Sequence, residues 1–79
     1  MKLWVISQNV NNGYDTYDSA VVAAETEEEA RNILPVGDTW ADVRRYGGWA
    51  SKPSEVTVEY LGETDRKISG VILASFNAG

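Results

Sequence analysis

The chain has 79 residues, with 12 acidic against 7 basic side chains and a formal net charge of -5. A chain this short predicts one small domain, 1–79, without room for a second. The negative charge disfavours direct binding to nucleic acid phosphates and to anionic membranes. Because cysteine and histidine are absent, disulfides, thiolate metal sites and the commonest proton shuttle are excluded. We therefore expect no cofactor, no metal site and no enzymatic activity.

Small size also bears on assembly and location. A small domain without disulfides or metals must pack well or associate with another copy, so a homo-oligomer is one expected state. The first residues contain too few consecutive apolar side chains for a secretory signal, and no run is long enough to span a membrane. These features predict a cytoplasmic protein.

Four segments have the composition of β-strands. Leu3–Ser7 is apolar on both alternating faces, which predicts a central strand. Ala20–Ala24 is a second apolar run, separated from the first by a loop that is long for a hairpin. Glu55–Leu61 alternates between apolar and polar residues and predicts a strand with one wet face. Gly70–Phe76 is apolar on both faces and predicts a second central strand.

One helix is expected between the second and third strands. Thr26 is followed three residues later by Glu29, the pattern of a capping box at a helix N-terminus. Pro35 should end this helix after about nine residues. The apolar residues that would face the sheet from one stripe are Ala30, Ile33 and Leu34.

The segment from Val36 to Pro53 is the least regular part of the chain. A short helical turn around Asp38 to Arg45 is predicted, because Asp38 or Thr39 can cap its start and Gly47 can end it.

The order of elements predicts an α+β fold, β-β-α-β-β, with a four-stranded antiparallel or mixed sheet and one helix across a face. One short helix cannot cover both faces of strands that are apolar on both sides. Either the Trp40 to Trp49 segment covers the second face, or this face is a subunit interface. The large aromatic residues expected in the core are Trp4, Tyr60 and Phe76.

The loop between the first two strands is the expected functional site, because long loops on a small scaffold are where binding residues concentrate. Together with the aromatic Trp40 to Trp49 segment, it predicts a surface that binds another protein. Aromatic side chains would act as anchors, and acidic ones would set register and association rate. The predicted contact residues are Tyr14, Asp15, Tyr17, Asp18, Trp40, Tyr46 and Trp49.

Two alternative interpretations of the loop stay open. In one, a homo-oligomer sequesters a nucleotide-like or other polar molecule, and the ligand-binding residues are Asn11, Asn12, Tyr14 and Tyr17. In the other, the loop is only a well-capped structural turn. Calcium binding is disfavoured, because the spacing of the Asn and Asp residues does not match an EF-hand loop.

The opening strand, the block NNGYDTYDSAVVAA, the Glu-rich helix and the ending ASFNAG resemble a family of short uncharacterised proteins of phages, prophages and bacterial genomes. The similarity excludes the middle of the chain, from Val36 to Lys52. It implies a small viral or mobile-element protein and no mechanism. By analogy with other small acidic phage proteins, we expect an inhibitor of a bacterial defence system such as CRISPR-Cas. Its partner would be a host protein in the cytoplasm of the bacterial cell.

Overall fold

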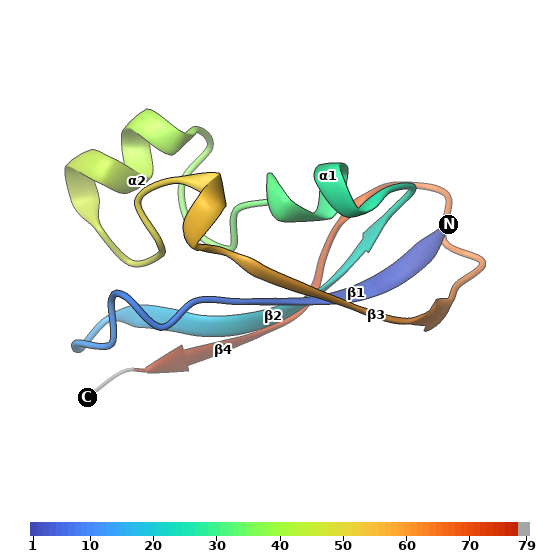
Figure 1. Ribbon diagram of the computed structural model, residues 1–79, viewed down its shortest axis with the longest axis horizontal. Helices are drawn as coiled ribbons and strands as arrows, with labels where there is room; N and C mark the ends of the chain where they lie inside the picture. The colour runs from blue at the N-terminus through green and yellow to red at the C-terminus, as the bar shows by residue number, and fades with distance from the viewer. Residues whose placement is uncertain (78–79) are drawn as a thin grey trace.

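The computed structural model describes residues 1–77, in which four strands form one antiparallel sheet with the helical elements on one side (Figure 1). The strands are β1 (Lys2–Ser7), β2 (Thr16–Ala24), β3 (Thr57–Glu63) and β4 (Gly70–Asn77), in the spatial order β3-β1-β2-β4. Between β2 and β3 come α1 (Glu27–Arg31), α2 (Trp40–Tyr46) and the 3₁₀ turn η1 (Pro53–Glu55). The predicted α+β class with a helix across an antiparallel sheet is confirmed. The last two residues of the ASFNAG ending, Ala78 and Gly79, lie outside the described residues.

The strand order confirms one central strand and corrects the other. β1 and β2 pair as a wide hairpin, in register from Lys2 opposite Ala24 to Ser7 opposite Ser19. β4 pairs with β2 and forms an edge of the sheet, so the prediction that Gly70–Phe76 is a central strand is wrong. The apolar composition of this segment misled the prediction because most of its large side chains are exposed.

Alternate residues of the central strands pack under the helical elements. Trp4 and Ile6 of β1 lie beside Ala20 and Val22 of β2 in one buried cluster. We call this side of the sheet the covered face. The cluster is completed from the region between β2 and β3, whose buried contributors are Ala30, Val43, Trp49, Ala50 and Val56.

The opposite side of the sheet carries the intervening residues of the same strands, among them Leu3, Val5 and Val21. Because α2 and Trp49 pack in the same core as α1, the prediction that the Trp40 to Trp49 segment covers this second face is wrong. In the part of the chain that the structure describes, no segment lies over it (Figure 1). We call it the open face.

Helix α1 ends earlier than predicted, at Arg31 instead of near Pro35. The cause is Asn32, whose side-chain Nδ2 donates to the carbonyl oxygen of Glu28 at 2.9 Å. Its own backbone N–H donates to the carbonyl oxygen of Glu29 at 3.2 Å, which closes a tighter turn. The apolar residues beyond this turn, Ile33 and Leu34, still pack against the core as predicted.

The two helices begin with different caps. Thr39 and Asp42 form a complete capping box at α2, with Asp42 N–H donating to Thr39 Oγ1 and Thr39 N–H donating to the Asp42 carboxylate, both at 3.1 Å. At α1, Thr26 Oγ1 accepts from Glu29 N–H as predicted, but the Glu29 carboxylate accepts from the N–H of Glu25 instead of Thr26. The predicted helix starts are therefore both confirmed, and one capping box is only half formed.

Of the three aromatic residues expected in the core, one is buried and two lie exposed on edge strands. Trp4 is buried, and its indole Nε1 donates to the carbonyl oxygen of Ala24 at 3.1 Å. Tyr60 and Phe76 were expected in the core, but they are 52% and 47% exposed because they lie on β3 and β4. Each packs one side of its ring against an inner neighbour, Tyr60 against Trp4 and Phe76 against Tyr17.

Candidate functional site

Gln8, the residue after β1, organises the loop that leads to β2. Its side chain is buried. The amide Nε2 donates to the carbonyl oxygens of Asn11, at 2.7 Å, and Tyr17, at 2.8 Å. The amide Oε1 accepts from the backbone N–H groups of Val10, at 3.0 Å, and Asn11, at 2.8 Å. Because both ends of this buried amide are hydrogen-bonded, the loop is fixed from inside by a residue that the sequence analysis did not single out.

Two hydrogen bonds join this loop to the segment that follows α2. The backbone N–H of Tyr17 donates to the carbonyl oxygen of Gly48 at 2.8 Å, and Asn11 Nδ2 donates to that of Trp49 at 3.3 Å. Gly47 and Gly48 turn the chain with φ angles of 79° and 100°, a region that glycine adopts without strain. The two segments predicted to form a binding surface therefore lie together at one end of the sheet (Figure 1). We call this region, residues 8–17 and 40–55, the loop end.

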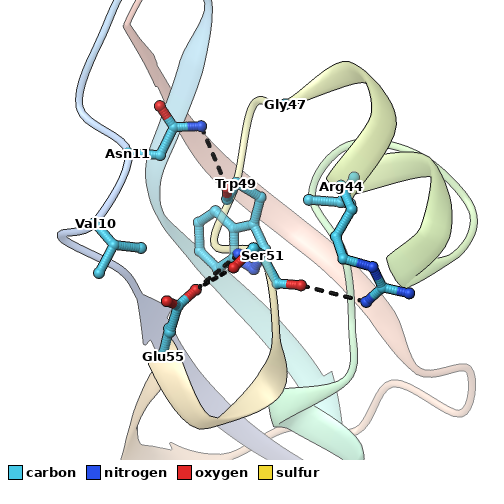
Figure 2. A pocket seen from close by; sticks show the side chains of 8 residues that line it. Val10, Asn11, Arg44, Gly47, Trp49, Ser51 and Glu55 are labelled. Carbon is cyan, nitrogen blue, oxygen red and sulfur yellow. Dashed lines mark hydrogen bonds between the residues drawn. The ribbon is translucent and has the colours of Figure 1, made fainter.

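A pocket of ≈ 230 Å³ opens in the loop end (Figure 2). Its walls come from three parts of the chain: the loop after β1, helix α2 and the segment that leads to β3. The residues that line it are Val10, Asn11, Val43, Arg44, Gly47, Trp49, Ser51 and Glu55. Apolar and polar side chains are mixed in this lining.

Arg44 and Glu55 bring opposite charges to this pocket without forming an ion pair with each other. Arg44 donates to the carbonyl oxygen of Ser51 at 3.4 Å, a long bond that leaves most of its N–H groups available. Ser51 donates to the Glu55 carboxylate from its hydroxyl, at 2.8 Å, and from its backbone N–H, at 2.9 Å. These two bonds, the hydroxyl first, hold the pKa of Glu55 below its ordinary value. Glu55 is therefore ionised at neutral pH.

Trp49 lines the pocket and carries a polar group without a partner. The residue is 2% exposed, and its indole Nε1–H has no hydrogen-bond acceptor in the described part of the chain. A buried donor left in this state costs about 1–3 kcal/mol.

The predicted protein-binding residues divide into exposed and packed groups. Tyr14 and Tyr46 are 79% and 75% exposed, and Asp15 and Asp18 are exposed beside them in the chain. Asp15 has a φ of 60°, a conformation uncommon outside glycine. Arg45 lies over the ring of Tyr46, with its guanidinium carbon 5.4 Å from the ring centre.

The other three predicted contact residues are packed to different degrees. Tyr17 is partly buried, with its ring 4.8 Å from that of Phe76. Trp40 is also partly buried, and its indole Nε1 donates to Asn32 Oδ1 at 3.1 Å. Trp49 is a core residue, so we remove it from the predicted contact surface.

The four residues predicted to bind a small ligand do not gather around one cavity. Asn11 lines the pocket, whereas Asn12 donates from Nδ2 to the carbonyl oxygen of Asn9 at 3.1 Å. Tyr14 is exposed, and Tyr17 packs against Phe76. Apart from Val10 and Asn11 of the loop, the pocket is lined by residues that were predicted to lie in a strand or in the irregular segment.

One signal for the pocket was present in the sequence. Ser51 and Glu55 are four residues apart around Pro53, and proline is favoured in the first turn of a short helix. That spacing brings the hydroxyl of Ser51, two residues before η1, to the carboxylate of Glu55 at the end of η1, as the hydrogen bond shows. No comparable signal marked Val10, Val43 or Arg44, because their proximity depends on how the loop packs against α2.

Within residues 1–77, no three His, Cys, Asp or Glu side chains are grouped closely enough to hold a metal ion. The helices of this part of the chain are all too short or too polar to cross a membrane. No family model matches the chain, and neither a curated protein nor a solved structure does. The similarity to phage proteins therefore stays a prediction.

Proposed function

We propose that this protein is a protein-binding module that contacts its partner with the loop end. The observation that carries the proposal is the pair of backbone-anchored hydrogen bonds, Tyr17 to Gly48 and Asn11 to Trp49, that holds the loop against the segment after α2. This attachment presents Tyr14 and Tyr46, both strongly exposed, from a scaffold that is already ordered. A preorganised surface loses less conformational entropy on binding than a flexible loop does.

The chemistry of the loop end fits a protein partner. Tyrosine buries a large area at low entropic cost and offers a hydroxyl for hydrogen bonding. Asp15 of the loop end and Asp18, the next acidic residue along β2, are exposed in a chain of net charge -5, which favours a partner with a basic surface and accelerates association at low salt. Consistent with the similarity to phage proteins, we propose more specifically an inhibitor that occupies the surface of a bacterial defence protein such as a CRISPR-Cas component.

Affinity capture from bacterial lysate tests the proposal with matched variants. We expect Tyr14→Ala and Tyr46→Ala to lose a protein that the unmodified chain retains, with no change in the circular dichroism spectrum. Ile68→Ala is the control, because Ile68 is strongly exposed on the loop between β3 and β4, at the other end of the sheet (Figure 1). Undiminished capture by both tyrosine variants would show that the loop end is not the binding surface.

The pocket supports a second candidate function, binding of a small polar molecule. Arg44 offers hydrogen-bond donors, while the ionised Glu55 offers an acceptor. A ligand that carries both a carbonyl or carboxylate oxygen and an N–H group would satisfy them, as amides and free amino acids do. This site lies within one chain, unlike the site between subunits that the sequence analysis considered.

Thermal unfolding in the presence of a panel of amino acids and small amides tests the second candidate. A ligand that binds only the folded chain stabilises it by RT ln(1 + [L]/Kd), so the melting temperature rises with the logarithm of ligand concentration once the site is nearly saturated. We expect Arg44→Gln to abolish that rise and Arg45→Gln, the neighbouring residue outside the pocket lining, to keep it. No rise with any member of the panel would contradict this function and leave the protein-binding proposal intact.

A further inference from the structure

The open face is built from three rows of side chains that run across the sheet. Strand register places Thr57, Ser7, Ser19 and Ser75 in the first row and Glu59, Val5, Val21 and Leu73 in the second. The third row contains Gly62, Leu3, Ala23 and Gly70. Most of these side chains are small or β-branched, so the face is low in relief and suits close packing against another sheet.

One apolar side chain stands out from this face beside a hollow. Leu73 is 68% exposed. The hollow has a volume of ≈ 300 Å³ and lies between β1, β2 and β4, with Val5, Val21, Ser19 and Ser75 among its lining residues. That volume is larger than a leucine side chain. The hollow therefore has room for a leucine side chain from another copy, and Val5 and Val21 give it apolar walls.

The distribution of charge on the open face allows two copies of the chain to contact each other through it. The chain carries a net charge of -5, yet Glu59, on the edge strand β3, is the one ionisable residue in the three rows. The half formed by β2 and β4 has none in these rows, and the exposed Asp18 of β2 lies next to the first row, where the register with β4 shifts between Tyr17 and Ser19. Two copies can therefore meet over the second and third rows of this half, Val21, Leu73, Ala23 and Gly70, without opposing like charges, which would destabilise a symmetric contact elsewhere on this acidic surface.

We propose that a second copy of this chain covers the open face, sheet against sheet, with Leu73 of each copy in the hollow of the other. A twofold arrangement makes this contact reciprocal and closed, so it yields a dimer and no longer assembly. The two sheets would lie about 10 Å apart, as in other stacked sheets.

The size of the face agrees with a small dimer interface. The molecule measures 33 × 23 × 18 Å, and Figure 1, viewed down the shortest axis, shows the strands running along the longest one with the helices stacked above them. The face is then bounded by the longest and shortest dimensions, which gives on the order of 600 Å² per copy. That is near the lower limit of specific interfaces, about 1,200 Å² in total, and predicts a dimer that dissociates on dilution.

Dimerisation in this way leaves α2 of each copy free, because this helix lies on the covered side of the sheet (Figure 1), and with it the pocket wall formed by Val43 and Arg44. The proposal does not depend on the function assigned to the loop end. If both hold, one dimer presents two binding surfaces and gains avidity for a partner with repeated sites.

Sedimentation velocity and light scattering over a wide range of concentrations test the proposal. We expect the unmodified chain to approach twice its monomer mass of 8.7 kDa at high concentration, and Leu73→Asp to remain at the monomer mass. Ile68→Asp is the matched control, since Ile68 is an equally exposed apolar residue outside the three rows, and this variant should dimerise as the unmodified chain does.

A second variant keeps the test decisive if Leu73→Asp fails to fold. Ser75→Arg places a long charged side chain at an exposed position that lines the hollow, and it should also give monomers while the circular dichroism spectrum stays native. A monomeric unmodified chain at every concentration would overturn the proposal. So would a dimer that survives in a folded Leu73→Asp or Ser75→Arg variant, because the contact would then lie elsewhere, for example along the β4 edge.

Discussion

The two faces of the sheet are made of alternate residues of the same strands, yet they differ in how they are protected from water. On the covered face, Ile6 and Val22 are fully buried beneath α1, α2 and the segment around Trp49. On the open face, their neighbours Val5 and Val21 lie partly exposed beside a hollow. The difference does not come from the strands, which are apolar on both sides. It comes from the chain between β2 and β3, all of which packs on one side.

The largest expected difference between the faces is in the free energy of unfolding. Ile6→Ala removes a fully buried side chain and should cost about 2–5 kcal/mol. Val5→Ala, one position earlier in the same strand, should cost about 1 kcal/mol or less, because its side chain is only partly buried. Urea unfolding measures both values. Both changes should be made in a Leu73→Asp background, so that dimerisation does not add to the stability of either variant.

Equal losses for the two variants would contradict this comparison. They would mean that the open face is packed within a single chain, which would also remove the reason for a second copy to cover it.

A smaller loss is expected at the boundary between the sheet and the loop end. Gln8→Ala removes the buried amide and leaves the groups it bonds, including the N–H groups of Val10 and Asn11, without partners. We expect a cost of about 1–3 kcal/mol and faster hydrogen exchange at those two amides. Urea unfolding and hydrogen exchange by NMR measure these effects.

The neighbouring Asn9 provides the control for this change. Its side chain is exposed, so Asn9→Ala should alter stability by less than about 0.5 kcal/mol. Slow exchange at Val10 and Asn11 in the Gln8→Ala variant would show that the loop is ordered by something other than this amide.

The sequence predicted those parts of the fold that depend on local signals. The strands followed from runs of apolar residues, and the helix starts followed from Thr26 and Thr39. The early end of α1 was missed because it depends on the side chain of Asn32. This side chain donates a hydrogen bond to the carbonyl oxygen of Glu28 and so competes with the backbone hydrogen bonds that would continue the helix. The position of β4 at an edge was missed because composition does not distinguish an exposed apolar strand from a buried one.

The sequence predicted the location of the candidate site better than it predicted the residues that form it. The loop and the Trp40 to Trp49 segment were both identified, and they do lie together. The role of Trp49 was missed because an aromatic residue after two glycines is equally compatible with surface and core. The pocket was missed because it joins Val10, Arg44 and Glu55, which approach one another only in the folded chain.

The smallest expected effect concerns the turn that closes the covering layer before β3. The hydroxyl and the backbone N–H of Ser51 stabilise the ionised form of Glu55, so the folded pKa of Glu55 lies below its ordinary value. A lowered pKa means that this contribution to stability is present at pH values above the unfolded pKa and is lost as the pH falls through the folded pKa. Ser51→Ala removes the hydroxyl bond and should move the pKa of Glu55 back toward its ordinary value.

An NMR titration of the Glu55 side-chain carboxyl carbon measures this change. Thr57→Ala is the control, because Thr57 is a nearby hydroxyl residue that makes no hydrogen bond to Glu55 in the described chain, and it should leave the pKa of Glu55 unchanged. If Glu55 already titrates at its ordinary value in the unmodified chain, the turn from Ser51 to Glu55 is not formed in solution. The covered face would then have a less ordered edge, and the pocket beside Arg44 would lack its acidic wall. A lowered value that Ser51→Ala removes would instead show that the irregular covering segment is as well defined as the helices before it.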